Sequence, residues 1–196
     1  MNRFFSKNRI EALTDGIFAI AMTILVLNID VSKISEMVSR GGLDSALWEM
    51  FPIFYSYFLG FFLLAILWLS QNKQYLHVKK VDANYLWINL LGLMLISLIP
   101  FSTSLISEYG DELVAAIFFH ANLMLAGLVY AWSWVYISGK KELQVEKISP
   151  NLYKNALYRN LLLPVVAMIA IGLVFLSPDW SSIMYLLIPV AKRYIK

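Results

Sequence analysis

The ionisable residues that could take part in chemistry lie at the start of one apolar stretch, RIEALTDGIFAIAMTILVL, which runs from Arg9 to Leu27. Arg9 and Asp15 lie in its first turns, and no charge follows Asp15 until Asp30. A stretch of this length can enter a bilayer as a helix with its polar end near one interface. Charged groups in a membrane helix are costly without partners, so Arg9 and Asp15 are candidate functional residues. A purely structural role is the alternative, with Arg9 reaching the membrane surface and Asp15 capping a neighbouring helix.

The same stretch has two chemically different faces when its residues are placed at 100° per residue. Thr14 and Asp15 point to one side and present a hydroxyl and a carboxylate to a neighbouring helix. An apolar stripe with a single hydroxyl, that of Thr23, runs along the other side. The stripe consists of Leu13, Gly16, Ile20, Thr23, Ile24 and Leu27. Ordinary helix packing would also account for it, since Thr is common at membrane helix contacts.

The composition is that of an integral membrane protein. Of the 196 residues, 60% are hydrophobic and 15% are charged, and the mean hydropathy is +0.67; no water-soluble domain of this size needs such a balance. The sequence has no cysteine, which excludes disulfides and thiol catalysis, and only His77 and His120 could serve a histidine site. The N-terminal segment is basic, but the apolar run after it has no small-residue cleavage site. This predicts a first membrane span that stays in the protein rather than a signal peptide that is removed.

Six apolar segments predict an all-α membrane protein with a single domain over residues 1–196. The predicted spans cover about residues 10–29, 47–70, 85–106, 113–137, 156–176 and 182–190. Residues 30–45 are polar and contain two adjacent glycines, so we expect an external loop there. Pro100 is expected to kink or end the third span, and Pro164 interrupts the fifth.

The charges of the connecting segments predict the orientation in the membrane. Lys and Arg gather before the first span, in residues 71–84 and 138–155, and at the C-terminal KRYIK, whereas the other side holds only Lys33 and Arg40. By the positive-inside rule, both termini are therefore cytoplasmic. The external segments are acidic; carboxylates at a pore mouth would concentrate cations, although acidic loops are more often simply solvated.

The first stretch resembles the signature of the transmembrane protein 175 family, the endolysosomal potassium channels and their shorter prokaryotic relatives. That signature reads Arg-x-x-x-Phe-Ser-Asp and continues into a run like Gly-Val-Phe-Ala-Ile-Ala. The matching residues here are Arg9, Asp15, Gly16, Phe18, Ala19, Ile20 and Ala21. Leu13 stands in place of the family's Phe, and Thr14, which keeps the hydroxyl, in place of its Ser.

Further matches lie in the second and third spans. Trp68 matches a Trp at the end of the family's second helix, Gln71 stands where the family usually has His, and Asn89 resembles its counterpart in the third helix. In the family these polar groups hold the first helix in place. The resemblance therefore implies a helix-positioning network of Arg9, Leu13, Thr14, Asp15, Trp68, Gln71 and Asn89. Donors that would satisfy Asp15 are present, but the missing His argues against pH sensitivity, and Trp68 alone would also serve as an interfacial anchor.

The resemblance implies a homotetrameric potassium channel with the first helix lining a central pore. Eukaryotic members carry two six-helix repeats and form dimers, so a single-repeat chain should need four copies. The filter sequence TVGYG is absent, so we expect a hydrophobic constriction and gate instead of a carbonyl filter. The expected constriction is Ile20, Ile24 and Leu27, with Thr23 for selectivity and Asn28 and Asp30 as the outer vestibule. We expect no cofactor, no metal beyond permeating K+, no nucleic acid, and a location in the plasma membrane bilayer.

The sequence is also compatible with three other functions. Asp15 could carry protons, which would give a proton channel or a proton-coupled transporter. An intramembrane enzyme is poorly supported, because the sequence contains no His-Glu-x-x-His, no Gly-x-Ser-x-Gly and no paired intramembrane carboxylates. A non-conducting scaffold is the third alternative, because a hydrophobic stripe also serves simple oligomerisation.

Overall fold

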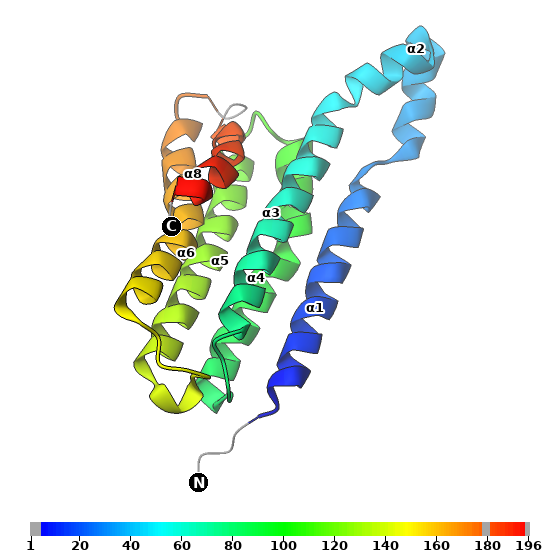
Figure 1. The fold of residues 1–196 in the computed structure, drawn as a ribbon. Coiled ribbons are helices and arrows are strands. Elements are labelled where there is room, and N and C mark those ends of the chain that lie inside the picture. The colour runs from blue at the N-terminus through cyan, green and yellow to red at the C-terminus, as the bar shows by residue number, and fades with distance from the viewer. Residues whose placement is uncertain (1–4, 178–180, 195–196) are drawn as a thin grey trace.

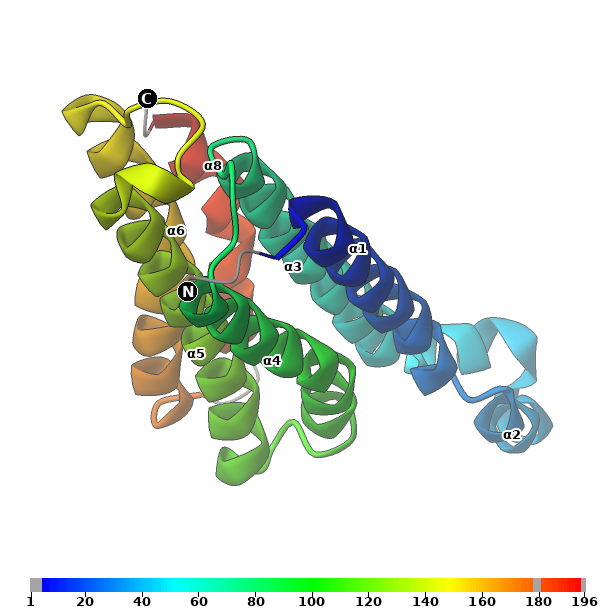
Figure 2. The ribbon, with the colours of Figure 1, turned by 90° about the horizontal axis from the view of Figure 1, so that it is seen from below.

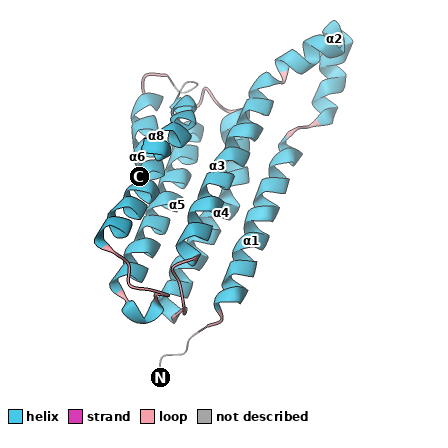
Figure 3. Ribbon diagram, in the orientation of Figure 1, coloured by secondary structure: helices cyan, strands magenta, loops and turns pink. Residues whose placement is uncertain are grey.

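The computed structural model describes residues 5–177 and 181–194, and this part of the chain is almost entirely helical (Figures 1 and 3). The five long helices of the bundle are α1 (Lys7–Ile24), α3 (Phe51–Tyr75), α4 (Ala83–Glu108), α5 (Leu113–Gly139) and α6 (Pro150–Val174). The remaining elements are η1 (Leu25–Asn28), α2 (Val31–Glu49), η2 (Lys141–Leu143), η3 (Ser182–Leu187) and α8 (Ile188–Tyr194).

Five helical stretches of the described chain are long and apolar enough to cross a membrane: residues 7–28, 38–75, 83–108, 113–139 and 150–174. The predicted all-α membrane architecture is thereby confirmed. The last predicted span, residues 182–190, is a shorter segment made of η3 and α8. Together these rise by about 22 Å, at about 2.0 Å per 3₁₀ residue and 1.5 Å per α residue, whereas the hydrocarbon core is about 30 Å thick.

The segment predicted as an external loop is helical. It forms α2, which projects beyond the end of the bundle in Figure 1 and lies away from the other helices in Figure 2. The helix is broken at Gly42, whose φ of +85° is accessible to glycine at little cost. The glycine pair therefore bends a helix instead of replacing it with a coil.

Neither proline inside a span ends its helix. Helix α4 continues through Pro100 to Glu108, and α6 continues through Pro164 to Val174. Neighbouring helices can stabilise a proline-containing membrane helix in this way. At Pro164 the neighbour is very close, because a Cβ added to Gly127 of α5 would lie 2.5 Å from the proline Cδ. A small residue at this position is what lets α5 and α6 pack tightly.

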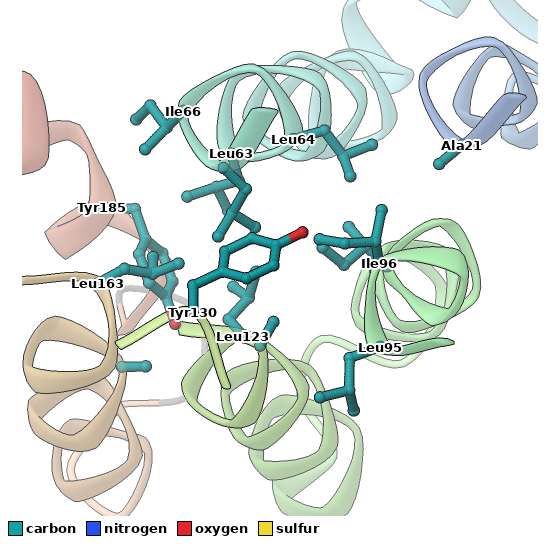
Figure 4. Packing of buried hydrophobic residues seen from close by; sticks show 14 of the residues in the cluster. Ala21, Leu63, Leu64, Ile66, Leu95, Ile96, Leu123, Tyr130, Leu163 and Tyr185 are labelled. Atoms are coloured by element: carbon teal, nitrogen blue, oxygen red, sulfur yellow. The ribbon is translucent and has the colours of Figure 1, made fainter. Parts of the chain in front are cut away.

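The hydrophobic core fills the space between α3, α4, α5 and α6. Tyr130 of α5 lies near its centre in Figure 4, with side chains of all four helices around it. The fully buried core includes Leu63, Leu64, Ile96, Leu123 and Tyr185. Helix α1 contributes Ala21 from the edge of this core and packs against α3 and α4. One long side of α1 is left without contacts in the described chain.

The basic end of the bundle is held together by Asp82, the N-cap of α4. Its carboxylate accepts hydrogen bonds from the Tyr85 amide at 2.8 Å, from the Tyr136 hydroxyl at 2.8 Å and from Lys140 Nζ at 2.9 Å. Burial alone would raise the pKa of Asp82, but these hydrogen bonds and the charge of Lys140 outweigh it and lower the pKa. The hydrogen bonds to Tyr136 and Asp82 raise the pKa of Lys140. The start of α4 is thus tied to the end of α5.

Candidate functional site

Helix α1 has one buried face and one exposed face, as the helical wheel predicts. The buried face consists of Ile10, Thr14, Phe18, Ala21 and Leu25, which recur every three or four residues. Such spacing defines one side of an α-helix. The opposite side of α1 is therefore available for contacts outside the single chain.

The exposed face of α1 carries the predicted constriction residues. Ile20, Ile24 and Leu27 are 59%, 42% and 74% exposed, and Leu13 beside Gly16 extends the stripe toward the start of the helix. Large apolar side chains this exposed on a membrane helix must face lipid or another copy of the chain. The stripe contains no charge between Asp15 and Asp30, so it forms a continuous apolar surface.

Thr23 is the one hydroxyl of this surface, and its proton is used within the helix. Its Oγ1 lies 3.0 Å from the carbonyl oxygen of Ala19 and 2.9 Å from that of Ile20. Thr often makes such bonds to the preceding turn in membrane helices. The hydroxyl oxygen keeps a lone pair for a further partner, so Thr23 can present an acceptor to whatever the exposed face meets.

The end of the stripe changes geometry. From Leu25 to Asn28 the helix tightens into the 3₁₀ turn η1, which rises further per residue than an α-helix. Asn28 is half-buried, and its Nδ2 has no hydrogen-bond partner among the described residues. Asp30 is exposed just beyond η1. The two predicted vestibule residues therefore follow the apolar stripe directly.

A buried hydrogen-bond cluster joins α1, α3 and α4 on the other face. The Thr14 hydroxyl lies 2.7 Å from that of Tyr75, and Tyr75 donates to Asn89 Oδ1 at 3.0 Å. Gln71 Nε2 donates to the same Asn89 oxygen at 2.7 Å, and Asn89 Nδ2 donates to the Tyr85 carbonyl at 2.8 Å. All five residues are buried. Buried hydrogen-bond networks of this kind fix the relative position of the elements they join, although Gln71 Oε1 and the Tyr85 hydroxyl have no hydrogen-bond partner among the described residues.

Asp15 takes part in a separate and more exposed contact. Its Oδ1 accepts a hydrogen bond from Trp68 Nε1 at 2.9 Å, and the carboxylate is exposed while the indole is half-buried. The expectation that the amides of Gln71 and Asn89 also serve Asp15 is wrong, since these two amides pair with each other. The reason is geometric, because Asp15 lies about 100° around α1 from the buried Thr14.

The other two residues of the predicted network lie apart from it. Arg9 and Leu13 are on the exposed face of α1, so they are not part of the buried cluster. Tyr75 is the member that the sequence did not indicate. Its spacing supplies a signal in retrospect, because Trp68, Gln71 and Tyr75 follow one another at three and four residues and so share one face of α3.

The two histidines of the bundle have structural roles. His120 is buried, with Nδ1 2.8 Å from the Tyr185 hydroxyl and Nε2 2.8 Å from Ser181 Oγ, and so ties α5 to the η3 segment. His77 packs its ring against Trp134 with centroids 5.6 Å apart. Within residues 5–177 and 181–194 no group of three or more His, Cys, Asp or Glu is placed to hold a metal ion.

Several known proteins are similar to this chain. Residues 9–100 match the family described as endosomal/lysosomal potassium channel TMEM175. A Streptomyces collinus protein named as a potassium channel is 32% identical over 136 residues, which are 67% of this chain and 65%, slightly under two thirds, of that protein. A Chamaesiphon minutus protein, also named as a potassium channel, is 29% identical over 178 residues, 89% of this chain and 87% of that protein.

Two further similarities concern the animal proteins and the fold. The human protein named as the endosomal/lysosomal proton channel TMEM175 is 32% identical over 113 residues, which cover 55% of this chain and 22% of that protein. The crystal structure of a lysosomal potassium-selective channel TMEM175 homologue from Chamaesiphon minutus superposes with a TM-score of 0.82. Its sequence is 25% identical, and the match covers 95% of this chain and 96% of that chain.

The helical bundle, with its first helix tied by a buried cluster and open on its other face, is that of a multi-pass membrane protein, and its similarity to known channels indicates the ion-channel class. In its signature and its fold, the chain is similar to the TMEM175 family. That family is one of ion channels rather than of enzymes.

Proposed function

We propose that this chain is the subunit of a homotetrameric, potassium-permeable cation channel whose pore is lined by α1. The observation that carries the proposal is the uncharged, exposed stripe of Ile20, Thr23, Ile24 and Leu27 on a helix whose other face is anchored by hydrogen bonds. The bacterial relatives named as potassium channels support the choice of ion. Four copies arranged around an axis would turn the stripe into a closed apolar neck.

The proposed neck acts as constriction and gate. From Ile20 to Leu27 it would extend about 12 Å, because the last three residues rise as a 3₁₀ turn. A hydrophobic neck of this length conducts when it widens enough to stay wet and closes by dewetting. Potassium sheds water more easily than sodium, so a narrow neck with a ring of Thr23 oxygens would favour it modestly. Asn28 and Asp30 would line the vestibule beyond.

The proposed setting is the plasma membrane of a prokaryotic cell, with both termini cytoplasmic. The positive-inside rule supports this orientation, since the connections after α3 and α5 are basic. The homotetramer and the bilayer are the proposed partners, and no cofactor is needed, because the permeating ions bind only in passing.

Ion flux from liposomes that contain only the purified chain tests the proposal. We expect potassium release down its gradient, slower sodium release, and a protein mass in mild detergent that corresponds to four chains. Protein-free liposomes and liposomes with an unrelated membrane protein control for leakage. Well-reconstituted protein that passes no ion would support the scaffold alternative, and an active monomer or dimer would contradict a pore on a fourfold axis.

Proton conduction through Asp15 is the second candidate. It is favoured by the exposed position of this carboxylate in the first half of α1 and by the animal relatives that are named as proton channels. Fluxes of potassium and protons measured on the same vesicles over a range of pH distinguish the two functions. Proton flux without potassium flux would replace the first proposal by the second.

A further inference from the structure

A second feature of the molecule lies away from α1, at the basic end of the bundle. A cavity of about 540 Å³ opens there between α3, α6 and α8. Its size is that of a typical small-molecule site. None of the residues assigned to ion conduction or to the anchoring cluster lines it.

Three cationic side chains converge on this cavity from three helices: Lys73 of α3, Arg159 of α6 and Lys192 of α8. No Asp or Glu is among the described residues that line it. Lys192 Nζ donates to Ser70 Oγ at 3.1 Å, a neutral partner. Burial, together with the charges of Lys73 and Arg159, lowers the pKa of Lys192 to about 8. An anion bound between these groups would relieve their repulsion.

The rest of the cavity wall is apolar and extends along α3 toward the middle of the bundle. Phe62, Ile66 and Leu69 line it on the turns before Lys73, and the buried ring of Trp134 closes its inner side. Phe62 and Lys73 are about 16 Å apart along the helix at 1.5 Å per residue. This is about half the thickness of the hydrocarbon core, the depth of one leaflet.

The last helical segment leaves part of the space between α3 and α6 open. Within the described residues α8 ends at Tyr194, partway along the bundle in Figure 1, and Figure 2 shows this segment between α3 and α6. Beyond Pro189 and Lys192, toward the basic end of the bundle, no described residue fills the space between α3 and α6. An apolar groove of this kind, open at the membrane level, is accessible to lipid.

We propose that this cavity binds one anionic phospholipid of the surrounding leaflet, with its phosphate at Lys73, Arg159 and Lys192 and an acyl chain along Phe62, Ile66 and Leu69. Basic pockets between membrane helices are suited to such headgroups. The zwitterionic lipids of the same leaflet carry a compensating ammonium group, which the three cations repel. The site therefore selects lipids by the charge of their headgroup and retains them through contacts with the acyl chain. This proposal does not depend on the proposed ion conduction.

Native mass spectrometry of the full chain tests this inference. The detergent-purified protein is titrated with phosphatidylglycerol and with phosphatidylcholine of the same acyl chains. We expect one phosphatidylglycerol per chain to be retained, and phosphatidylcholine to be retained much less. K73Q and K192Q should each weaken retention by about fivefold, the factor expected from one cation near an anionic lipid. K154Q is the matched control, because Lys154 is an exposed cation of α6 outside the cavity lining.

A second variant tests the apolar part of the site. Ala156 lines the cavity from α6, so A156F should fill the groove and displace the lipid while all three cations remain. Inorganic phosphate at millimolar concentration should not displace it, because phosphate lacks the acyl contacts. Equal retention of the two lipids, an equal loss in K154Q, retention by A156F, or full displacement by phosphate would each overturn the proposal.

Discussion

Thr14 and Tyr75, which are 61 residues apart in the chain, lie with their hydroxyl oxygens 2.7 Å apart inside the bundle. The direction of this hydrogen bond follows from the rest of the cluster. Tyr75 has a single hydroxyl proton and donates it to Asn89, so Thr14 must be the donor to Tyr75. A hydroxyl at position 14 therefore completes a chain of donors that runs from α1 through α3 to α4.

Thr14→Val should destabilise the protein without changing the shape of α1. The substitution leaves the Tyr75 oxygen with one acceptor site unpaired in a buried position, which costs on the order of 1–3 kcal/mol. We expect a lower melting temperature in detergent and a smaller assembled fraction. Thr23→Val is the matched control, because the Thr23 hydroxyl bonds only its own helix. Equal melting temperatures for the two variants would contradict an anchoring role of Thr14.

Asp15→Ala and Asp15→Asn should differ. Alanine removes the acceptor of the Trp68 indole, whereas asparagine keeps an oxygen for it and removes only the charge. We expect Asp15→Ala to lower the yield of assembled protein more than Asp15→Asn does. Flux measurements then test the charge itself: an assembled Asp15→Asn protein with normal potassium flux and no proton flux would favour the proton-carrying function.

Acid should loosen the basic end of the bundle. The pKa of Asp82 is lower in the folded chain than its ordinary value of 3.8, so its stabilising effect is complete above about pH 4 and is lost as the pH falls through the folded value. The pKa of Lys140 is raised above 10.5, so its contribution is complete below that pH and is lost as the pH rises through the raised value. The Asp82–Lys140 ion pair therefore makes its full contribution to stability from about pH 4 to about pH 10.

Asp82→Asn provides the measurement for this pH dependence. Melting temperatures of wild type and Asp82→Asn are compared between pH 3 and pH 7. We expect the wild type to be more stable at pH 7 and the difference to shrink toward pH 3, since protonation removes the same charge. A constant difference over this range would show that the charge of Asp82 contributes little to the stability of the folded chain.

The sequence predicts what depends on one helix at a time and misses what depends on the register between helices. The two faces of α1 follow from its 3.6-residue period, and the exposure of Ile20 and Leu27 agrees with the predicted stripe. The pairing of Gln71 with Asn89 requires the height of α3 relative to α4, which periodicity does not contain. Tyr75 is missed for a different reason: a tyrosine at the end of an apolar helix is ordinarily an interfacial residue.

Ile20→Asn and Leu27→Asn should raise ion flux if the stripe is the neck of a pore. In a tetramer each substitution introduces four amides into the narrowest part, which keeps it wet. Ile169→Asn is the matched control, because Ile169 is a similarly exposed isoleucine (46%) on α6, a helix that lies on the other side of the bundle from α1 (Figure 1). Single-channel or liposome flux measurements decide the question. Unchanged flux in both α1 variants, with normal assembly, would mean that the stripe faces lipid or packing partners.

Thr23→Val tests whether the hydroxyl of the stripe contributes to selectivity. Valine has nearly the same shape, so the change removes the hydroxyl and leaves the width of the neck almost unaltered. The Thr23 proton is bonded to carbonyls of the preceding turn, so only the oxygen lone pair can replace water around a passing ion. A partial coordination site worth about 1.4 kcal/mol would change a permeability ratio about tenfold.

An acceptor ring of this kind should stabilise a partly dehydrated potassium ion, and its loss should move the reversal potential under a potassium/sodium gradient toward the non-selective value. Ser at the same position is the rescue variant, because Thr23→Ser restores the oxygen with a smaller side chain. A reversal potential that is unchanged in Thr23→Val would assign the hydroxyl to its intrahelical bonds alone. Selectivity would then depend on the width of the apolar neck, which Ile20, Ile24 and Leu27 set through their size.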